Sequence, residues 1–393
     1  SASASPSATA TVAQPSATPT PGASPTAGAS AATFTTAGAV SNWQGFTWTT
    51  LPPDSPILTA IPRIQVIPWR GGYVAYGTTN GGSIGVVWTS ADGETWRQVT
   101  DIVAPFILMA VSPTGLVAIA EDLSAASPTA TVWTSTDGLA WHKAGTASGI
   151  GSIDSIAGTS AGLVATGHTV DGTGKFATSQ FGVAFSTDGL NWTPVSIQPG
   201  LTWSQDYGPE VQSGNGRFFL MGGYTGGTAS DARPLLASLT QPGRYGSGIL
   251  GATIRTGGLW WSDDGRTWTR SSDTAYVAGL DFGQGGIVMH TTEGLVPGGT
   301  GLELSTDGGK SWRKSNDPLG AVVCGPRECS TGPDGVISSN GTFFVAVKSN
   351  GKAWISYDGQ AWTSIGWAGP LSSLSLLVLP RGVVSDGQYG AAK

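Results

Sequence analysis

Charged side chains are scarce in this sequence. Asp, Glu, Lys and Arg together make up 11% of its 393 residues, against roughly 25% in a typical globular domain. The formal net charge is −6 and the pI is about 5.0, so the chain lacks the basic field needed to bind nucleic acid or an anionic membrane surface. We therefore expect a surface made largely of Ser, Thr, Asn and Gly, and no nucleic-acid partner.

Long apolar runs and metal-binding residues are lacking as well. No apolar run approaches the roughly 20 residues of a membrane-spanning helix. The histidines His142, His168 and His290 are scattered, and the only cysteines are Cys324 and Cys329. Two thiols alone cannot complete a tetrahedral metal site, so we expect no metal and no cofactor. In an exported protein, the Gly-Pro turn between the cysteines favours a small disulfide loop.

One motif is abundant: Ser-x-Asp-Gly-x-x-Trp, or a near copy of it, occurs six times. Asp followed by Gly between two β-forming runs is typical of a hairpin turn, because Asp bonds its own backbone and Gly accepts a positive φ. We predict that the tryptophan packs against this turn, and we interpret the motif as structural. Its Asp and Trp residues are Asp92 and Trp96, Asp137 and Trp141, Asp188 and Trp192, Asp264 and Trp268, Asp307 and Trp312, and Asp358 and Trp362.

The spacing of the motif predicts the architecture. A degenerate copy of the motif occurs at 42–48 and ends at Trp48. When it is included, the steps from one motif Trp to the next are 48, 45, 51, 76, 44 and 50 residues. A period of roughly 40–50 residues is typical of β-propeller blades, and the longest step contains an insertion at about 226–257. Two short apolar runs precede each motif, for example 64–67 and 73–76. Each unit is therefore predicted to hold four strands, A to D, with the Asp-Gly turn between C and D.

The blade count follows from the two ends of this region. The last unit has apolar runs for strands A and B at 374–379 and 382–384, and no motif follows them. The degenerate copy at 42–48 supplies strands C and D. We predict an all-β, seven-bladed β-propeller whose last blade pairs two N-terminal strands with two C-terminal strands, which leaves the ring no free edge.

These motifs resemble the Asp-box, or BNR, repeats of the sialidase superfamily, over about residues 40–390. The copy from Ser305 to Trp312 has the family's usual length, and the other five are one residue shorter between Asp and Trp. The shorter form is similar to that of many secreted BNR-like proteins of unknown activity. The resemblance implies that the Asp boxes lie on outer C–D turns, away from the active site, and that they are structural.

The resemblance also raises a sialidase-like or other glycoside hydrolase as an alternative function. A sialidase of this family needs three arginines, a Tyr/Glu nucleophile pair and an acid/base Asp, and an Arg-Ile-Pro motif normally supplies the first arginine. The nearest sequence here is Pro62-Arg63-Ile64-Gln65, which has no Pro after Arg-Ile. No arginine triad can be assembled. A Gly-x-Ser-x-Gly match at 81–85 precedes a strand rather than a helix, so we interpret it as a loop.

Residues 1–33 differ in composition from the rest. They consist almost entirely of Ala, Ser, Thr, Pro and Gly, without charge, and such a segment buries too little apolar surface to fold. We interpret it as a disordered linker ahead of the propeller at 34–393. It resembles the stretch that follows the lipid-bearing cysteine of bacterial surface lipoproteins; a secreted tail, a wall-crossing segment or an O-glycosylated stalk are alternatives. We expect an exported bacterial protein, extracellular or at the cell surface, that meets the membrane only through such an anchor.

If function lies on one face, we expect the face opposite the Asp boxes, which the D–A and B–C loops build. Aromatic residues beside carboxylates and arginines on two D–A loops suit a ligand such as a sugar, although tying down long loops would explain them equally well. We predict an extracellular binding or assembly module with a glycan or a surface protein as partner. The resemblance also admits an assembly-factor role like that of BNR proteins that help build photosynthetic complexes. The candidate ligand-binding residues are Trp203, Asp206, Tyr207, Glu210, Arg327 and Glu328.

Overall fold

The structure is a computed structural model that describes residues 47–50, 64–79, 84–91, 95–122, 129–168, 181–197, 209–221, 258–271, 277–291, 301–319, 335–348, 350–367, 376–379, 382–385 and 388–391. The chain divides into the units Ser1–Thr33 and Phe34–Lys393, and all described residues belong to the second. A search of these residues for a helix long and apolar enough to span a membrane finds none.

Six four-stranded antiparallel sheets are each made of four consecutive strands, and we call them blades 1 to 6. Blade 1 holds β2 (Ile64–Trp69), β3 (Gly72–Thr79), β4 (Ile84–Ser90) and β5 (Arg97–Ala104). Blade 2 holds β6 (Phe106–Ser112), β7 (Gly115–Asp122), β8 (Thr129–Ser135) and β9 (His142–Thr146). Blade 3 holds β10 (Ser152–Thr159), β11 (Gly162–His168), β12 (Phe181–Ser186) and β13 (Thr193–Val195).

The remaining three continuous blades follow the same plan. Blade 4 holds β14 (Glu210–Gly214), β15 (Arg217–Met221), β16 (Leu259–Ser262) and β17 (Thr269–Arg270). Blade 5 holds β18 (Val277–Gly283), β19 (Gly286–Thr291), β20 (Gly301–Ser305) and β21 (Arg313–Lys314). Blade 6 holds β22 (Gly335–Ser339), β23 (Phe344–Lys348), β24 (Lys352–Ser356) and β25 (Thr363–Trp367).

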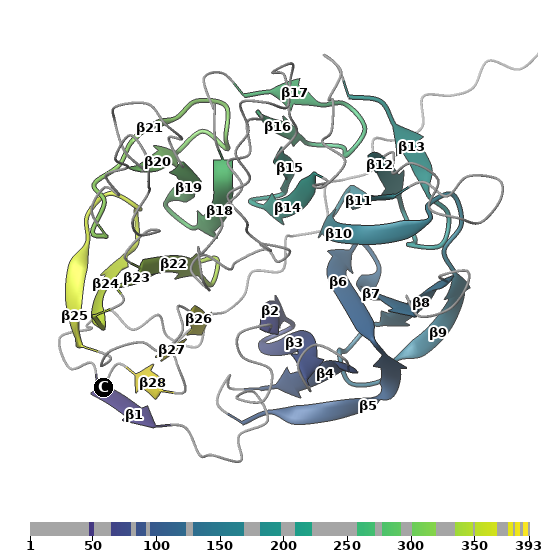
Figure 1. Cartoon of the computed structure of the whole chain (residues 1–393), viewed down its shortest axis with the longest axis horizontal. Helices are drawn as coiled ribbons and strands as arrows, with labels where there is room; N and C mark the ends of the chain where they lie inside the picture. The colour runs from purple at the N-terminus through teal and green to yellow at the C-terminus, as the bar shows by residue number, and fades with distance from the viewer. Residues whose placement is uncertain are drawn as a thin grey trace, which may run out of the picture. The chain divides into compact units, whose positions relative to one another are not determined.

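The blades are stacked side by side through their first strands. Strand β6 contacts β10, β10 contacts β14, and β18 contacts β22. Figure 1 shows the blades following one another in chain order, with the first strand of each innermost and the fourth outermost. Within residues 34–393 the fold is therefore an all-β β-propeller with four-stranded blades.

A further four-stranded sheet is composite, and it corrects the predicted closure. Its order is β1 (Thr47–Thr50), β28 (Gln388–Ala391), β27 (Gly382–Ser385) and β26 (Leu376–Leu379). One N-terminal strand thus pairs with three C-terminal strands, whereas the sequence analysis expected two of each. The prediction of a seven-bladed propeller closed by two N-terminal strands is therefore wrong: the propeller has six blades, not seven, and the composite sheet is built from strands of the two ends of the unit.

The strand that the prediction missed, β28, begins shortly after β27 ends. Ser385 pairs with Gln388, so only Asp386 and Gly387 separate β27 from β28. Asp-Gly is the strongest two-residue hairpin signal, but no tryptophan follows it to complete the repeated motif. Strand β1 then pairs with β28 in the register Thr47 to Ala391, and it occupies the position of a fourth strand.

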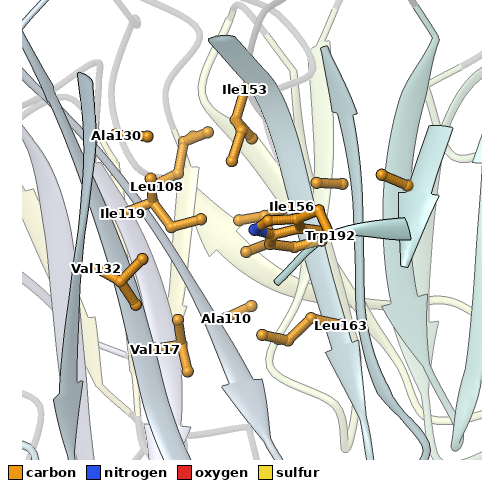
Figure 2. Close-up of a cluster of buried hydrophobic side chains, with 12 residues drawn as sticks. Leu108, Ala110, Val117, Ile119, Ala130, Val132, Ile153, Ile156, Leu163 and Trp192 are labelled. Atoms are coloured by element: carbon orange, nitrogen blue, oxygen red, sulfur yellow. The ribbon is translucent and has the colours of Figure 1, made fainter. Parts of the chain in front are cut away.

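Apolar side chains fill the space between neighbouring blades. Between blades 2 and 3, Trp192 is 5% exposed and lies in a cluster with Leu108 and Ile153 (Figure 2). Because both faces of a blade are covered in this way, the inner strands are apolar on both faces, as in the fully buried run 218–221. The other motif tryptophans repeat the arrangement: Trp141 lies between blades 1 and 2, Trp268 between blades 3 and 4, and Trp312 and Trp362 pack partly buried against the next two clusters.

Truncating a motif tryptophan should destabilise the propeller according to its burial. Trp141 is 4% exposed, so Trp141→Ala should lower the free energy of unfolding by about 3–5 kcal/mol, the usual cost of removing a buried large aromatic side chain. Trp362 is only partly buried, and Trp362→Ala should cost less. Urea unfolding followed by fluorescence measures both, and equal losses in the two variants would contradict this account.

Candidate functional site

The five Asp-Gly turns that are fully described share one hydrogen-bond pattern. In blade 4, Asp264 Oδ1 accepts hydrogen bonds from Arg266 N (2.8 Å) and Thr267 N (2.7 Å). Ser262 Oγ donates to Asp264 Oδ1 (3.0 Å) and accepts from Gly265 N (2.8 Å). The pattern recurs around Asp137, Asp188, Asp307 and Asp358. Asp92 lies outside the described residues, and Trp96 of the same copy is buried.

These hydrogen bonds set the pKa of the turn carboxyl groups. Partial burial alone would raise the pKa of Asp264, but the N–H groups of Thr267 and Arg266 and the hydroxyl of Ser262 lower it to about 2. The pKa of Asp307 is lowered to about 2 in the same way, against the effect of its own partial burial. Because each negative charge is already stabilised inside its own turn, these carboxylates hold the turn together and are poorly suited to acid–base chemistry.

The glycine of each turn packs against the preceding blade. Gly265 has a φ of +73°, and a Cβ atom built on it would lie 2.7 Å from side-chain atoms of both Val164 and Phe185 in blade 3. In the same way, Gly189 meets Val117 of blade 2 at 2.9 Å. A side chain is thus excluded by the left-handed backbone conformation and by the neighbouring blade.

At two of the joints, the preceding blade also reaches the turn through a serine that lies just after its outer strand. Ser148 follows β9, and its N–H donates to Leu190 O at 2.8 Å, while Trp192 N donates to Ser148 O at 2.9 Å. Ser271 follows β17, and its Oγ donates to Gly309 O of blade 5 at 3.0 Å. The Asp-Gly turns are therefore joints between blades as well as hairpin turns.

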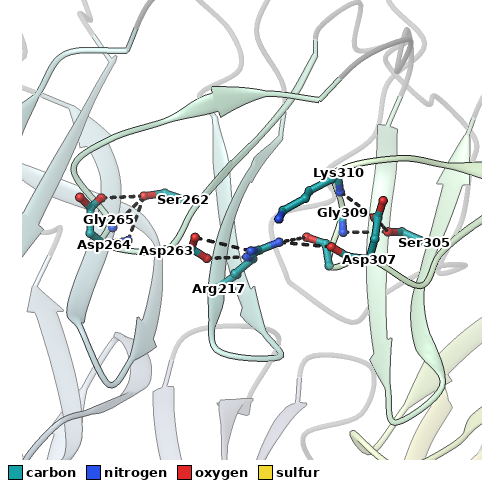
Figure 3. A network of polar contacts seen from close by, with 10 residues as sticks. Arg217, Ser262, Asp263, Asp264, Gly265, Ser305, Asp307, Gly309 and Lys310 are labelled. Carbon is teal, nitrogen blue, oxygen red and sulfur yellow. Dashed lines mark hydrogen bonds and ion pairs between the residues drawn. The ribbon is translucent and has the colours of Figure 1, made fainter. Parts of the chain in front are cut away.

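An arginine adds a polar link at the joint between blades 4 and 5 (Figure 3). Arg217 begins β15, and its Nη1 donates to Gly308 O at 2.7 Å. Its Nε and Nη2 donate to the carboxylate of Asp263, and its guanidinium lies 4.5 Å from the ring centroid of Trp261. The Arg217 side chain therefore links blades 4 and 5, and it does not reach a ligand at the other end of the blades.

The two ends of each blade have different roles. Second strands begin beside an Asp-Gly turn: a Cβ on Gly115, the first residue of β7, would lie 2.5 Å from Ser135 O. Second strands end, and first strands begin, at the opposite end, which we call the distal end. The sequence analysis expected ligand binding at the distal end.

One of the predicted ligand-binding residues lies in the described part of the chain. Glu210 begins β14 at the distal end and is 9% exposed. The other predicted residues, Trp203, Asp206, Tyr207, Arg327 and Glu328, lie outside the described residues, as do Cys324, Cys329, Arg63 and the insertion at 226–257.

Blade 3 fixes the segment that contains Glu210. Thr166 Oγ1 donates to Pro209 O at 2.7 Å, and Val211 N donates to Ser155 Oγ at 2.9 Å. The hydroxyl groups of Ser155 and Thr166 are themselves 2.7 Å apart. Residues 209–211, which directly follow the predicted residues 203–207 in the chain, are therefore anchored on both sides of Glu210. Glu210 Oε1 in turn accepts a hydrogen bond from Gln212 Nε2 at 3.0 Å.

A second buried carboxyl group lies at the distal end, between blades 2 and 3. Glu121 is 2% exposed near the end of β7, and its Oε1 accepts a hydrogen bond from Ile153 N at 2.9 Å. Burial raises the pKa of Glu121 to about 7, against the effect of the Ile153 N–H group and with a further contribution from the charge of Asp154. This acid therefore titrates near neutral pH, unlike the acids of the Asp-Gly turns.

Sequence reasoning missed Glu121, Thr166 and Gln212 because it looked for function on loops. All three lie on strands that are otherwise buried and apolar. A signal was present for Glu121, since it is the only charged residue in the otherwise apolar stretch 115–121, and a buried strand rarely ends in a carboxylate without a reason. In the part of the chain that the structure describes, no three His, Cys, Asp or Glu side chains are grouped so that they could hold a metal ion.

Comparisons with known proteins give no assignment. No family model matches the chain, and no curated protein matches it. Solved structures that are similar include the β-propeller domain of the Trilobed protease from Pyrococcus furiosus, with 10% identity, a TM-score of 0.44, and coverage of 82% of this chain and 91% of that chain. A thermostable family-43 glycoside hydrolase has 17% identity, a TM-score of 0.36, and coverage of 71% and 100%. A glycosyl hydrolase from Bacteroides ovatus has 12% identity, a TM-score of 0.34, and coverage of 69% and 96%.

Removing the carboxylate of an Asp-Gly turn should loosen that joint. Asp264→Ala deletes the acceptor of two backbone N–H groups and two hydroxyl groups, and we expect a loss of about 1–2 kcal/mol in the free energy of unfolding. Asp264→Asn keeps an oxygen acceptor and should cost less. Chemical denaturation at neutral pH measures both variants, and an Asn variant as unstable as the Ala variant would contradict this assignment.

Glu121 should make the stability of the protein depend on pH. Its pKa is raised from 4.5 to about 7 in the folded state, so the folded state binds a proton that the unfolded state releases. The free energy of unfolding should therefore fall as the pH rises from about 4.5 to 7, by up to roughly 3 kcal/mol. Glu121→Gln should remove this slope, and Asp154→Asn should reduce it. Denaturant unfolding at several pH values measures it, and an unchanged slope in Glu121→Gln would show that another group titrates.

Proposed function

We propose that this protein is a binding module that holds a hydroxyl-rich ligand, most simply a glycan, at the distal end of the propeller. The site would be formed by the segment 203–210, with Trp203 and Tyr207 stacking on sugar rings and Asp206 and Glu210 accepting hydrogen bonds from hydroxyl groups. The proposed setting is extracellular or at the cell surface, which the scarcity of charge and the Ala/Ser/Thr/Pro composition of residues 1–33 support.

The anchoring of residues 209–211 is the observation that carries this proposal. Three hydrogen bonds, donated by Thr166 Oγ1 and Gln212 Nε2 and accepted by Ser155 Oγ, fix the backbone of this segment and the carboxylate that follows the candidate aromatic residues. A binding loop that starts from a fixed strand end loses less conformational entropy when it takes up a ligand. The two buried hydroxyl groups bond the residues on either side of Glu210 and so fix its position.

The Asp-Gly end is the less suitable place for such a site. Its carboxylates accept hydrogen bonds from their own turns, and Arg217 is bound to Asp263 and Gly308. Groups already paired in this way would have to give up existing hydrogen bonds in order to bind a ligand.

A glycan array probed with the full chain tests the proposal. Trp203→Ala and Tyr207→Ala should each weaken binding about tenfold or more, as loss of an aromatic contact at the centre of a site does. Thr166→Val removes the hydroxyl that binds Pro209 O and should weaken binding without touching the ligand. Tyr357→Ala is the matched control, because Tyr357 is an exposed aromatic residue, 41% exposed, in the Asp-Gly turn of blade 6.

Two results would contradict the proposal. One is a wild-type protein that binds no glycan on the array, and the other is a loss in Tyr357→Ala equal to that in Trp203→Ala. Thermal unfolding of each variant separates a loss of binding from a loss of folding.

A glycoside hydrolase is the second candidate, and the pKa of Glu121 favours it. A carboxylic acid that titrates near pH 7 is suited to protonate a leaving group, and such enzymes use a second carboxylate, for which Asp154 is the neighbouring candidate. Release of nitrophenol from a panel of nitrophenyl glycosides tests this function. The expected result for a hydrolase is turnover by the wild type that is lost in Glu121→Gln, and turnover that persists in this variant would exclude Glu121 as the acid.

A further inference from the structure

The outer edge of blades 4 and 5 carries an unusual share of the positive charge. Eleven lysines and arginines lie in the described residues, and six of them belong to these two blades. The six are Arg217, Arg266, Arg270, Lys310, Arg313 and Lys314. All except Arg217 are exposed, in a chain whose formal net charge is −6.

Three of these cations are neighbours in sequence of residues that link blades 4 and 5. Ser271 Oγ donates to Gly309 O at 3.0 Å and accepts from Trp312 Nε1 at 2.9 Å. Arg270 directly precedes Ser271, Lys310 follows Gly309, and Arg313 follows Trp312. Arg270 lies over Trp260, which packs between blades 3 and 4, and Lys310 lies over Trp261, which packs toward blade 5. The cations are therefore spread along the outer edge of the two blades.

The carboxylates of the same region are already engaged. Asp263 is paired with Arg217, and Asp264 and Asp307 accept hydrogen bonds within their own turns. Glu303 lies opposite Lys314 across the strand pair. The side chains of Arg270, Lys310 and Arg313 are exposed to solvent.

From this arrangement we infer that the outer edge of blades 4 and 5 binds a linear anionic polysaccharide, carboxylated or sulfated. Exposed guanidinium and ammonium groups bind carboxylate and sulfate oxygens directly and release counterions from the polymer. This surface is distinct from the proposed distal site and does not depend on it.

The surroundings of the cations favour a polysaccharide over other polyanions. An acidic protein partner would need an apolar centre to its interface, but the exposed large apolar side chains of the described part are Ile84, Leu139 and Tyr357, which belong to other blades. A single-stranded nucleic acid would need open aromatic faces for base stacking. Here cations already lie over the rings of Trp260, Trp261 and Phe185.

Binding to heparin and to polygalacturonate, measured by titration at several NaCl concentrations, tests this inference. The double variant Arg270→Gln/Arg313→Gln should bind more weakly, and the slope of log K against log [NaCl] should fall in magnitude by about 1.4–1.8, because each lost contact removes roughly 0.7–0.9. The control double variant Arg97→Gln/Lys352→Gln removes the same charge from exposed positions in blades 1 and 6 and should keep the wild-type slope.

Each outcome decides the inference. Binding to heparin alone identifies a sulfated polymer, and binding to polygalacturonate alone or to both identifies a carboxylated one. Equal losses in the two double variants would show non-specific attraction and overturn the inference. It would also fail if the wild type bound neither polymer at low salt, or if it bound single-stranded DNA more tightly than both. Thermal unfolding of all variants confirms that they are folded.

Discussion

The contact between each Asp-Gly turn and the second strand of the preceding blade is the constraint on which the propeller depends. The turn glycine has a positive φ and meets a buried apolar side chain of that strand, as Gly265 meets Val164. The tryptophan at the end of the same turn fills the space between the two blades. One short motif therefore closes a hairpin, positions a blade against its neighbour and supplies the core between them, which explains why it recurs with each blade.

This use of the motif separates the two ends of the propeller. At the Asp-Gly end, the polar groups are taken up by hydrogen bonds that hold blades together, and exposed lysines and arginines lie beside the joint between blades 4 and 5. At the distal end, buried polar side chains such as Thr166 instead fix the starts of strands and the loop ends that precede them. Loop residues of a ligand site at the distal end can therefore change without disturbing the Asp-Gly joints.

Most of the fold was predictable from the sequence because the Asp-Gly turn is a local signal with a local cause. The spacing of six motifs gave the four-stranded blades, and the apolar runs gave their first two strands. The closing sheet was predicted incorrectly because no tryptophan follows Asp386-Gly387 in the sequence, so the third C-terminal strand had no repeat to reveal it. The site was less predictable still: Glu121 and Gln212 acquire their roles from long-range packing between blades, and no spacing in the sequence shows which strand ends meet.

Carboxylic acids at the two ends of the propeller make the stability of the folded state depend on pH in opposite directions. The folded state needs Asp264 and Asp307 ionised, because their turns donate to the charged form, and this contribution is lost as the pH falls from 3.8 towards about 2. The folded state needs Glu121 protonated, because it is buried, and this contribution is lost as the pH rises from 4.5 towards about 7. These groups together favour greatest stability near pH 4. Near neutral pH, the cost of ionising the buried Glu121 lowers the free energy of unfolding. Glu121 lies between blades 2 and 3 at the distal end, where we place the ligand.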